Sequence, residues 1–269
     1  MKFQHTLIAV LFLSTAAFAQ ATVTGKVAST DKNHNKTINI ATDEGKAALK
    51  VNYSAISKDK NNAVNKEQAF STMAQKADKW ISKLSGTAVR DGNGVVVAKL
   101  YKIPTVTSKM PEHKDLGRMS FKQVGNMDVW YGDWADVPHY SKDPAKEGKN
   151  YSVYYAGSET VAMPQSGKAN YDVKGINNYV NANTEILKGN LTADFTEKTL
   201  KGSIASSKLA INMDAKIKNS AIDGNAVANG KDEGKLSGHF YGNNAAGLAG
   251  IAEFSKKPSL NTAFGGTKK

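Results

Sequence analysis

The fold class is indicated most clearly by the sequence Leu209-Ala210-Ile211-Asn212-Met213-Asp214-Ala215-Lys216-Ile217-Lys218. Apolar and polar side chains alternate along it, and this period of two predicts a β-strand with one face in a core and the other in water. Strands of this kind are typical of an antiparallel sheet with one solvated side. This part of the chain is therefore expected to form an antiparallel β structure.

Short strands of the same kind continue on both sides of this stretch. Turns containing Gly, Asn and Asp separate them, and the predicted strands are 169–175, 187–195, 200–206, 209–218, 222–228, 235–242 and 248–254. Many short strands at even spacing favour a barrel or a sandwich, and closure into a barrel would remove the exposed sheet edges. We expect the tail, residues 265–269, to be frayed.

The chain before Gly157 has a mixed pattern. A helix is predicted over 66–84, because apolar residues recur there at steps of three and four; Asn65 suits its N-cap and Gly86 its end. Irregular stretches follow, including 104–117, and loops of this length often carry function. The predicted strands are 22–29, 37–41, 48–53, 87–90, 95–101, 129–134 and 151–156, with a hairpin turn at 91–94.

The first residues have the layout of a secretory signal peptide. Lys2 supplies a positive charge, Leu7–Leu13 form a short apolar run, and small residues offer cleavage sites at 17–19 and 19–21. The apolar run is too short to span a bilayer. We therefore expect residues 1–21 to be removed and the mature protein to be secreted.

Composition excludes several classes of function. The chain has no cysteine, which excludes disulfides, a lipidated N-terminal cysteine and thiolate ligation. Its net charge of +12 favours anionic partners, but the lysines are scattered and form no basic stripe with interleaved aromatics, so nucleic acid is not expected. No HExxH, GxSxG or P-loop motif occurs, so we expect no enzyme activity.

Several motifs in the second half carry a family resemblance. Met163–Gly175 resembles the first strand of transferrin-binding-protein-B-like barrels; Leu191–Phe195 and Lys198–Gly202 resemble the next two strands; Gly238–Ala245 and Leu248–Gly250 resemble the closing hairpin. The resemblance implies an eight-stranded antiparallel C-terminal β-barrel after a variable N-terminal binding domain. It also implies Slam-dependent export through an outer-membrane translocon.

A non-lipidated branch of that family, the hemophilin-type haemophores, resembles this chain more specifically. Val129–Trp134 and Tyr151–Tyr155 are similar to that branch, and the chain lacks the lipobox cysteine of the lipoproteins. The resemblance implies a mainly β protein with a clamp-like α+β domain over 22–124, holding haem b, and a barrel domain over 125–269. It further implies a monomer from a Gram-negative bacterium that delivers haem to a TonB-dependent outer-membrane receptor. Host haem proteins such as haemoglobin are further candidate partners.

Few residues can supply the axial donor that haem iron needs. Without cysteine the donors are His, Met and Tyr, and neutral imidazole suits iron best. His113 lies on an irregular segment and His139 on the long loop beside Pro138, and two such loops can clamp iron from both sides. His34, in a polar turn, is a third candidate. His239 is expected to point outward from the barrel, opposite to Phe240.

Aromatic and thioether side chains would pack against the haem faces. The candidates are Met73 and Trp80 on the helix, and Trp130, Tyr131, Trp134 and Tyr140 around the long loop. Arg90, Arg118 and nearby lysines are candidates for the propionates.

Two other functions fit the same architecture. One is a module that binds a host protein, such as an iron carrier or a complement factor, through N-terminal loops. The other is a binder of a different small metabolite. Loop histidines beside aromatics favour haem, because a module that binds only proteins needs no iron ligand.

Overall fold

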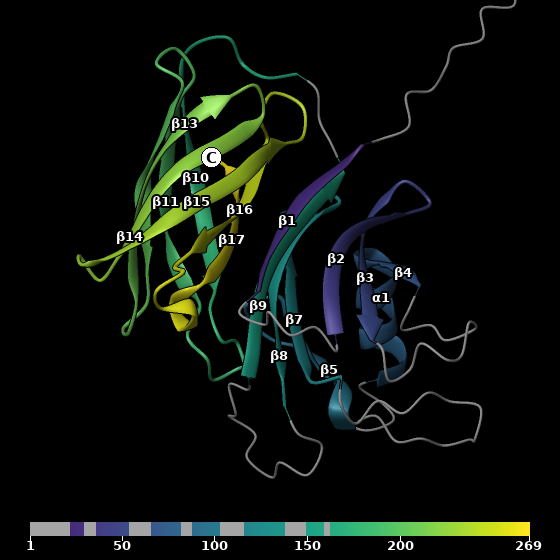
Figure 1. Ribbon diagram of the computed structural model, residues 1–269. Coiled ribbons are helices and arrows are strands. Elements are labelled where there is room, and N and C mark those ends of the chain that lie inside the picture. The colour runs from purple at the N-terminus through teal and green to yellow at the C-terminus, as the bar shows by residue number, and fades with distance from the viewer. Residues whose placement is uncertain are drawn as a thin grey trace, which may run out of the picture.

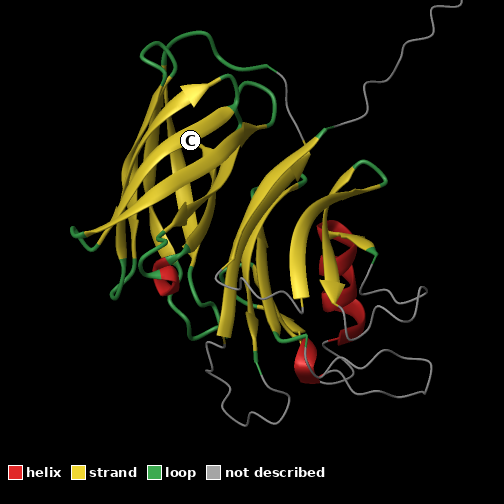
Figure 2. Ribbon diagram, viewed as in Figure 1, coloured by secondary structure: helices red, strands yellow, loops and turns green. Residues whose placement is uncertain are grey.

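The computed structural model describes residues 22–29, 36–53, 66–81, 88–102, 116–137, 149–158 and 162–269. These residues form a six-stranded sheet, a three-stranded sheet with a helix, and a closed barrel (Figures 1 and 2). Within these ranges no helix has the length and hydrophobicity needed to cross a membrane. The predicted mainly β class, with an α+β region before an antiparallel barrel, is confirmed.

The C-terminal barrel has eight antiparallel strands and closes where β10 pairs with β17. Side chains alternate between the apolar interior and water, most regularly on β13, where Ile211, Met213, Ala215 and Ile217 are buried. The strands are β10 (Lys168–Ile176), β11 (Leu187–Asp194), β12 (Thr199–Ala205), β13 (Ala210–Lys218), β14 (Ala221–Ala228), β15 (Asp232–Tyr241), β16 (Gly247–Glu253) and β17 (Thr262–Lys268).

The expected frayed tail is instead the strand that closes the barrel. β17 pairs with both β10 and β16, and Phe264 is fully buried. Its adjacent glycines obscure the alternation in the sequence, and packing explains them. A Cβ on Gly265 would lie 2.6 Å from the Tyr131 ring, and one on Gly266 would lie 2.3 Å from the Asp172 carbonyl oxygen.

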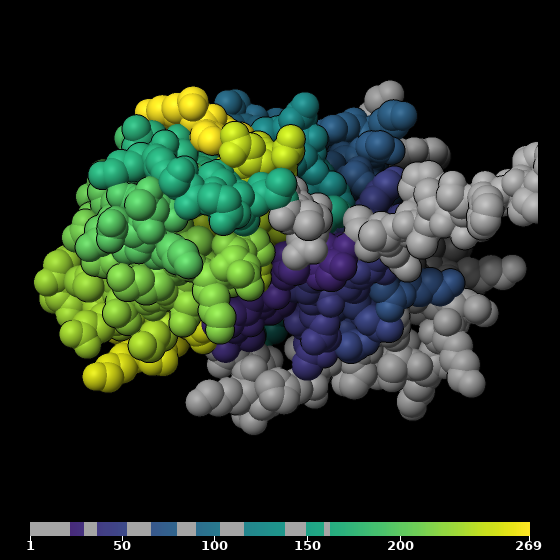
Figure 3. All heavy atoms as spheres, turned by 90° about the horizontal axis from the view of Figure 1, so that it is seen from above, coloured from purple at the N-terminus to yellow at the C-terminus, as the bar shows by residue number. Residues whose placement is uncertain are grey.

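The six-stranded antiparallel sheet is the middle layer of the molecule, in the order β1-β9-β8-β7-β6-β5. One face packs on the outside of the barrel, where Tyr131 and Tyr155 share an apolar cluster with Tyr241 and Ile251. The space-filling view shows the two parts in direct contact (Figure 3). The strands are β1 (Val23–Ser29), β5 (Ala88–Arg90), β6 (Val95–Lys99), β7 (Arg118–Gln123), β8 (Val129–Asp136) and β9 (Lys149–Ser158).

The other face of this sheet packs against a small α+β layer. The layer contains β2 (Lys36–Asp43), β3 (Lys46–Tyr53), β4 (Glu67–Ala69) and helix α1 (Phe70–Lys76), which continues as the π-helical turn Ala77–Ile81. Phe70 is fully buried and shares an apolar cluster with Trp130 and Tyr154 of the middle sheet. Leu100–Lys102 form a 3-10 turn after β6, and Pro258–Leu260 another before β17.

The helix begins later than its apolar period predicts. The prediction started it at Lys66, but Glu67–Ala69 pair with β3, and the Ala69 N–H donates to Asp43 Oδ2 at 3.0 Å. These sheet contacts hold the residues extended, so Ala69 becomes the N-cap. Asn65, Gly86 and residues 82–84 lie outside the described residues.

The boundary between the sheet and the barrel lies later than the predicted 124/125. That position falls between β7 and β8, which pair with each other from Arg118↔Ala135 to Gln123↔Trp130. The aromatic strands β8 and β9 therefore belong to the six-stranded sheet, and the first barrel strand begins at Lys168.

Candidate functional site

One row of paired residues marks a common end of the six-stranded sheet. Ser29 pairs with Ser152, Ser152 with Trp134, Trp134 with Met119, and Met119 with Ala98. Just beyond this row β1, β6 and β8 end, and β7 and β9 begin. Because paired residues lie side by side, every chain segment leaving these strands here starts from the same end of the sheet, the lower end in Figure 1.

The three predicted iron ligands belong to segments attached at this end. His34, His113 and His139 lie outside the described residues, but each is six residues or fewer along the chain from Ser29, Met119 or Trp134 of the row. The fold thus joins to one end of the sheet segments that are far apart in the sequence.

A groove opens beside this end, between the edge strands β1 and β2. Its volume is about 410 Å³, within the range of roughly 300–1,000 Å³ typical of small-molecule sites. Its apolar wall includes Val27, Ile38 and Ile40, which also pack on the core behind the sheet. Its polar residues include Ser29 and Ser152 of the row, whose hydroxyls are hydrogen-bonded at 2.8 Å.

The described chain on either side of the 103–115 segment is held firmly. The Trp134 indole N–H donates to the Leu116 carbonyl at 2.7 Å, and the Tyr101 N–H donates to the Gly117 carbonyl at 3.2 Å. Gly117 has φ +72°, and a Cβ there would lie 2.1 Å from the Ala135 carbonyl oxygen, so only glycine fits. The segment carrying His113 therefore leaves from fixed points.

The predicted aromatic contacts do not lie on one surface. Trp130 stacks on Phe70, with ring centroids 5.8 Å apart and 13° between the planes, and Met73 packs at the edge of the same cluster. Tyr131, the next residue along β8, faces the barrel and contacts Gly265. The Trp80 side chain and Tyr140 lie outside the described part. Trp134, in the row, shares the Trp130 side of the sheet.

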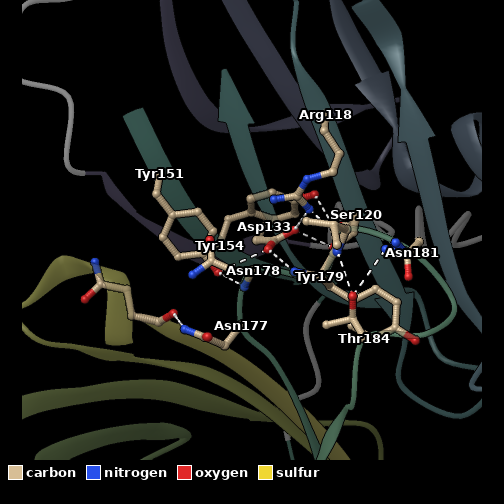
Figure 4. Close-up of polar contacts among 12 residues, drawn as sticks. Arg118, Ser120, Asp133, Tyr151, Tyr154, Asn177, Asn178, Tyr179, Asn181 and Thr184 are labelled. Atoms are coloured by element: carbon tan, nitrogen blue, oxygen red, sulfur yellow. Dashed lines mark hydrogen bonds and ion pairs between the residues drawn. The ribbon is translucent and has the colours of Figure 1, made fainter. Parts of the chain in front are cut away.

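Both arginines expected to meet the propionates form ion pairs in the structure. Arg118 is 2% exposed and forms a 2.9 Å ion pair with the buried Asp133 (Figure 4). Arg90 pairs with Asp78 at 3.0 Å. Two lysines that the sequence did not single out are better placed, because Lys99 pairs with Arg118 in the sheet and Lys102 lies three residues further on. Burial, together with repulsion from Lys102, lowers the pKa of Lys99, and a nearby anion would favour its charged form.

His239 lies away from this end. As alternation predicts, Phe240 is inside the barrel and His239 outside, but His239 packs against the sheet instead of facing open water. Its Nδ1 is 3.0 Å from the Tyr155 hydroxyl, and burial lowers the pKa of its imidazole. Among the described residues no cluster of three or more His, Asp or Glu side chains is arranged to hold a metal ion.

Comparisons with known proteins agree with this architecture. Residues 18–146 match the HphA N-terminal heme-binding domain, and residues 161–268 match the HphA C-terminal domain. The first match contains His34, His113 and His139, and it contains Ser29, Ala98, Met119 and Trp134 of the row but not Ser152.

Two solved structures share the fold at low sequence identity. The apo haemoglobin receptor HpuA from Kingella denitrificans is 17% identical, with a TM-score of 0.50 over 94% of this chain and 88% of that chain. HpuA from Kingella denitrificans in complex with human haemoglobin is 17% identical, with a TM-score of 0.51 over 93% and 88%. A double mutant of Transferrin Binding Protein B from Haemophilus parasuis Hp5 is 18% identical, with a TM-score of 0.45 over 91% and 44%.

Proposed function

Because the chain belongs to the HphA family, whose N-terminal domain binds haem, we propose that it is a secreted haemophore. It captures haem b outside the cell and delivers it to a TonB-dependent outer-membrane receptor for iron acquisition. Export follows the predicted signal peptide and an outer-membrane translocon, and the protein acts as a monomer.

The row across the six-stranded sheet is the observation that carries the proposal for the site. It ties the segments of all three candidate histidines to one end of a sheet that is buried on both faces. A rigid support of this kind fixes the points on the sheet from which two loops would reach the iron.

We assign the iron to His113 and His139, with His34 as the alternative to either. Neutral imidazole donates its lone pair to iron, so ligation competes with protonation. Lys99 and Lys102 neutralise the propionates, and their charges lie next to the start of the segment that carries His113. Trp134, Met73, Trp80, Trp130, Tyr131 and Tyr140 remain candidates for contact with the porphyrin. Trp130 and Tyr131 face opposite sides of β8, so both can touch it only if the sheet rearranges.

Haemoglobin is the candidate source of the haem. HpuA, which shares this fold over most of both chains, has been solved in complex with human haemoglobin. The alternative function, binding of a host iron carrier or complement factor without haem, needs no iron ligand. Only haem binding requires the loop histidines.

Absorption titration of the mature chain with haemin tests the proposal. We expect a saturable one-to-one Soret shift that His113→Ala and His139→Ala each alter, with His34→Ala as the third variant. His239→Ala is the matched control, because this histidine contacts Tyr155 on the barrel side of the sheet. Absence of a saturable shift in the parent protein would overturn the haemophore assignment. If the parent protein binds haemin and all three variants have the parent's spectrum, the iron ligand must be a Tyr or a Met.

A further inference from the structure

A buried carboxylate joins the sheet to the barrel just inside the row. Asp133 is fully buried, and four groups donate hydrogen bonds to it: Arg118 Nη1 at 2.9 Å, the Ser120 hydroxyl, the Tyr151 hydroxyl at 3.1 Å and the Tyr179 N–H at 2.9 Å. The first three come from β7 and β9 of the sheet. The fourth comes from the connection between β10 and β11 of the barrel (Figure 4).

The Arg118–Asp133 ion pair holds both backbone polar groups of Tyr179, a barrel residue. Asp133 accepts from the N–H of Tyr179, and Arg118 donates to its carbonyl oxygen. The preceding N–H, that of Asn178, donates to the Tyr151 hydroxyl at 2.8 Å. Two residues of the barrel connection are therefore held through their backbone, which fixes their position more strictly than apolar contact does.

The same connection is tied to a second barrel loop. Asn177 Nδ2 donates to the carbonyl oxygens of Ser259 and Asn261, each at 2.8 Å. These carbonyls lie between β16 and β17, the strands on which the sheet packs. The ion pair therefore binds a barrel connection that is itself held by hydrogen bonds to a second barrel loop.

Burying two charges is costly even after the surroundings relax, and apolar residues would often give an equally stable contact. Such a pair is better explained by the geometry it enforces. Arg118 and Asp133 each lie one residue from the row, at the sheet end to which the segments with His113 and His139 attach. Leu116, two residues before Arg118, is the first described residue after the segment 103–115, which contains His113.

We infer that Arg118 and Asp133 are positioning residues for haem, fixing the ends of β7 and β8 against the barrel so that the iron-ligand segments leave at a set spacing. The barrel is then part of the binding apparatus as well as a carrier of the N-terminal domain. The inference rests on the proposed function.

The test is haemin affinity of the full chain carrying Arg118→Lys. Lysine keeps the charge opposite Asp133 but lacks the planar fork that also reaches the Tyr179 carbonyl. We expect haemin affinity to fall roughly tenfold or more, as for residues that orient metal ligands, with a shifted Soret band. If Arg118→Lys does not fold, haemin affinity is measured on Tyr151→Phe instead. This variant removes one hydrogen bond to Asp133 and keeps the ion pair, and its affinity should also fall.

Two controls separate positioning from stability. Leu236→Ala creates a cavity in the barrel core and lowers Tm without touching the ion pair. Thr24→Val removes another polar contact between sheet and barrel, the hydrogen bond from the Thr24 hydroxyl to the Tyr241 hydroxyl at 3.1 Å. Both should bind haemin like the parent. The inference is overturned if Leu236→Ala weakens binding as much as Arg118→Lys, or if the folded Arg118→Lys or Tyr151→Phe binds like the parent. A parent with no saturable Soret shift instead refutes the proposed function.

Discussion

Two buried tyrosines on neighbouring strands differ in what their hydroxyls contact. The Tyr154 hydroxyl donates to the Ser120 carbonyl at 2.8 Å, whereas the Tyr131 hydroxyl has no partner among the described residues. Burial raises the pKa of both phenols, so both stay protonated. An unpartnered buried hydroxyl costs stability, so Tyr131→Phe should raise the free energy of unfolding by about 1 kcal/mol. Tyr154→Phe, the matched control, should lower it by about 1 kcal/mol. Urea unfolding measures both, and a loss of stability in Tyr131→Phe would contradict the packing described.

His239 should make stability fall in mild acid. Burial lowers its pKa below the ordinary value of 6.5, so between these two pKa values the unfolded chain binds a proton that the folded chain does not. The contribution is fully present above pH 6.5 and is lost as the pH falls through the lowered pKa of the folded state. The carboxylates with lowered pKa, such as Glu67 and Asp194, change the pH dependence of stability only below about pH 4.5. Tm measured from pH 7.5 to 5 should therefore fall less in His239→Gln than in the parent; parallel curves would contradict this assignment.

At the scale of single residues, alternation along the sequence was informative. It correctly separates His239 from Phe240. It was not applied to Trp130 and Tyr131, which were both expected to contact haem but face opposite sides of one strand. It cannot tell which arginine becomes buried, because the partner of Arg118 is made by pairing β7 with β8. Whether His34, His113 and His139 bind iron stays a prediction.

Gly132 allows the close pairing of β7 and β8. A Cβ there would lie 2.0 Å from the Ser120 carbonyl oxygen and 2.8 Å from the Phe121 Cα, and backbone atoms cannot move aside cheaply. Gly132→Ala should lower the free energy of unfolding by about 1–3 kcal/mol, as overpacking of a core does. Gly92→Ala is the control, because a Cβ there meets nothing within 4 Å. Equal stability of the two variants in urea unfolding would show that the strands pair less closely than described.

Elements were predictable where their own pattern decides their structure. The alternating barrel strands and the 91–94 turn, in which Asp91 Oδ1 accepts from the N–H groups of Asn93 and Val95, follow from local chemistry. The start of the helix and the strand β17 did not follow. Glu67–Ala69 are extended because β3 lies beside them, and β17 is a strand because the barrel must close. Both depend on partners far away in the sequence.

The whole molecule should unfold in one step. The barrel and the six-stranded sheet share an apolar cluster and the buried ion pair, so neither part can lose its structure without exposing the other. All three tryptophans precede residue 135, so their fluorescence reports the N-terminal layers, whereas far-UV circular dichroism also reports the barrel. The two urea transitions should coincide. A tryptophan transition at lower urea would show that the N-terminal layers unfold independently.

The position of the aromatic strands is a property of the whole molecule. β8 and β9 are buried on both faces, and a sequence pattern of that kind fits a sheet between two layers as well as a barrel wall. The pairing of β9 with β1 and of β8 with β7 shows that both strands belong to the six-stranded sheet. The barrel therefore begins after residue 158. The barrel itself was predictable from its strands and family motifs.

A crystal structure of the haemin-loaded protein, with the iron located by its anomalous signal, would show where this chain binds haem. We expect one iron at the end of the six-stranded sheet marked by Ser29, Trp134 and Met119, bonded to His113, His139 or His34. An iron bound at His239, inside the barrel or at the opposite end of the sheet would contradict it.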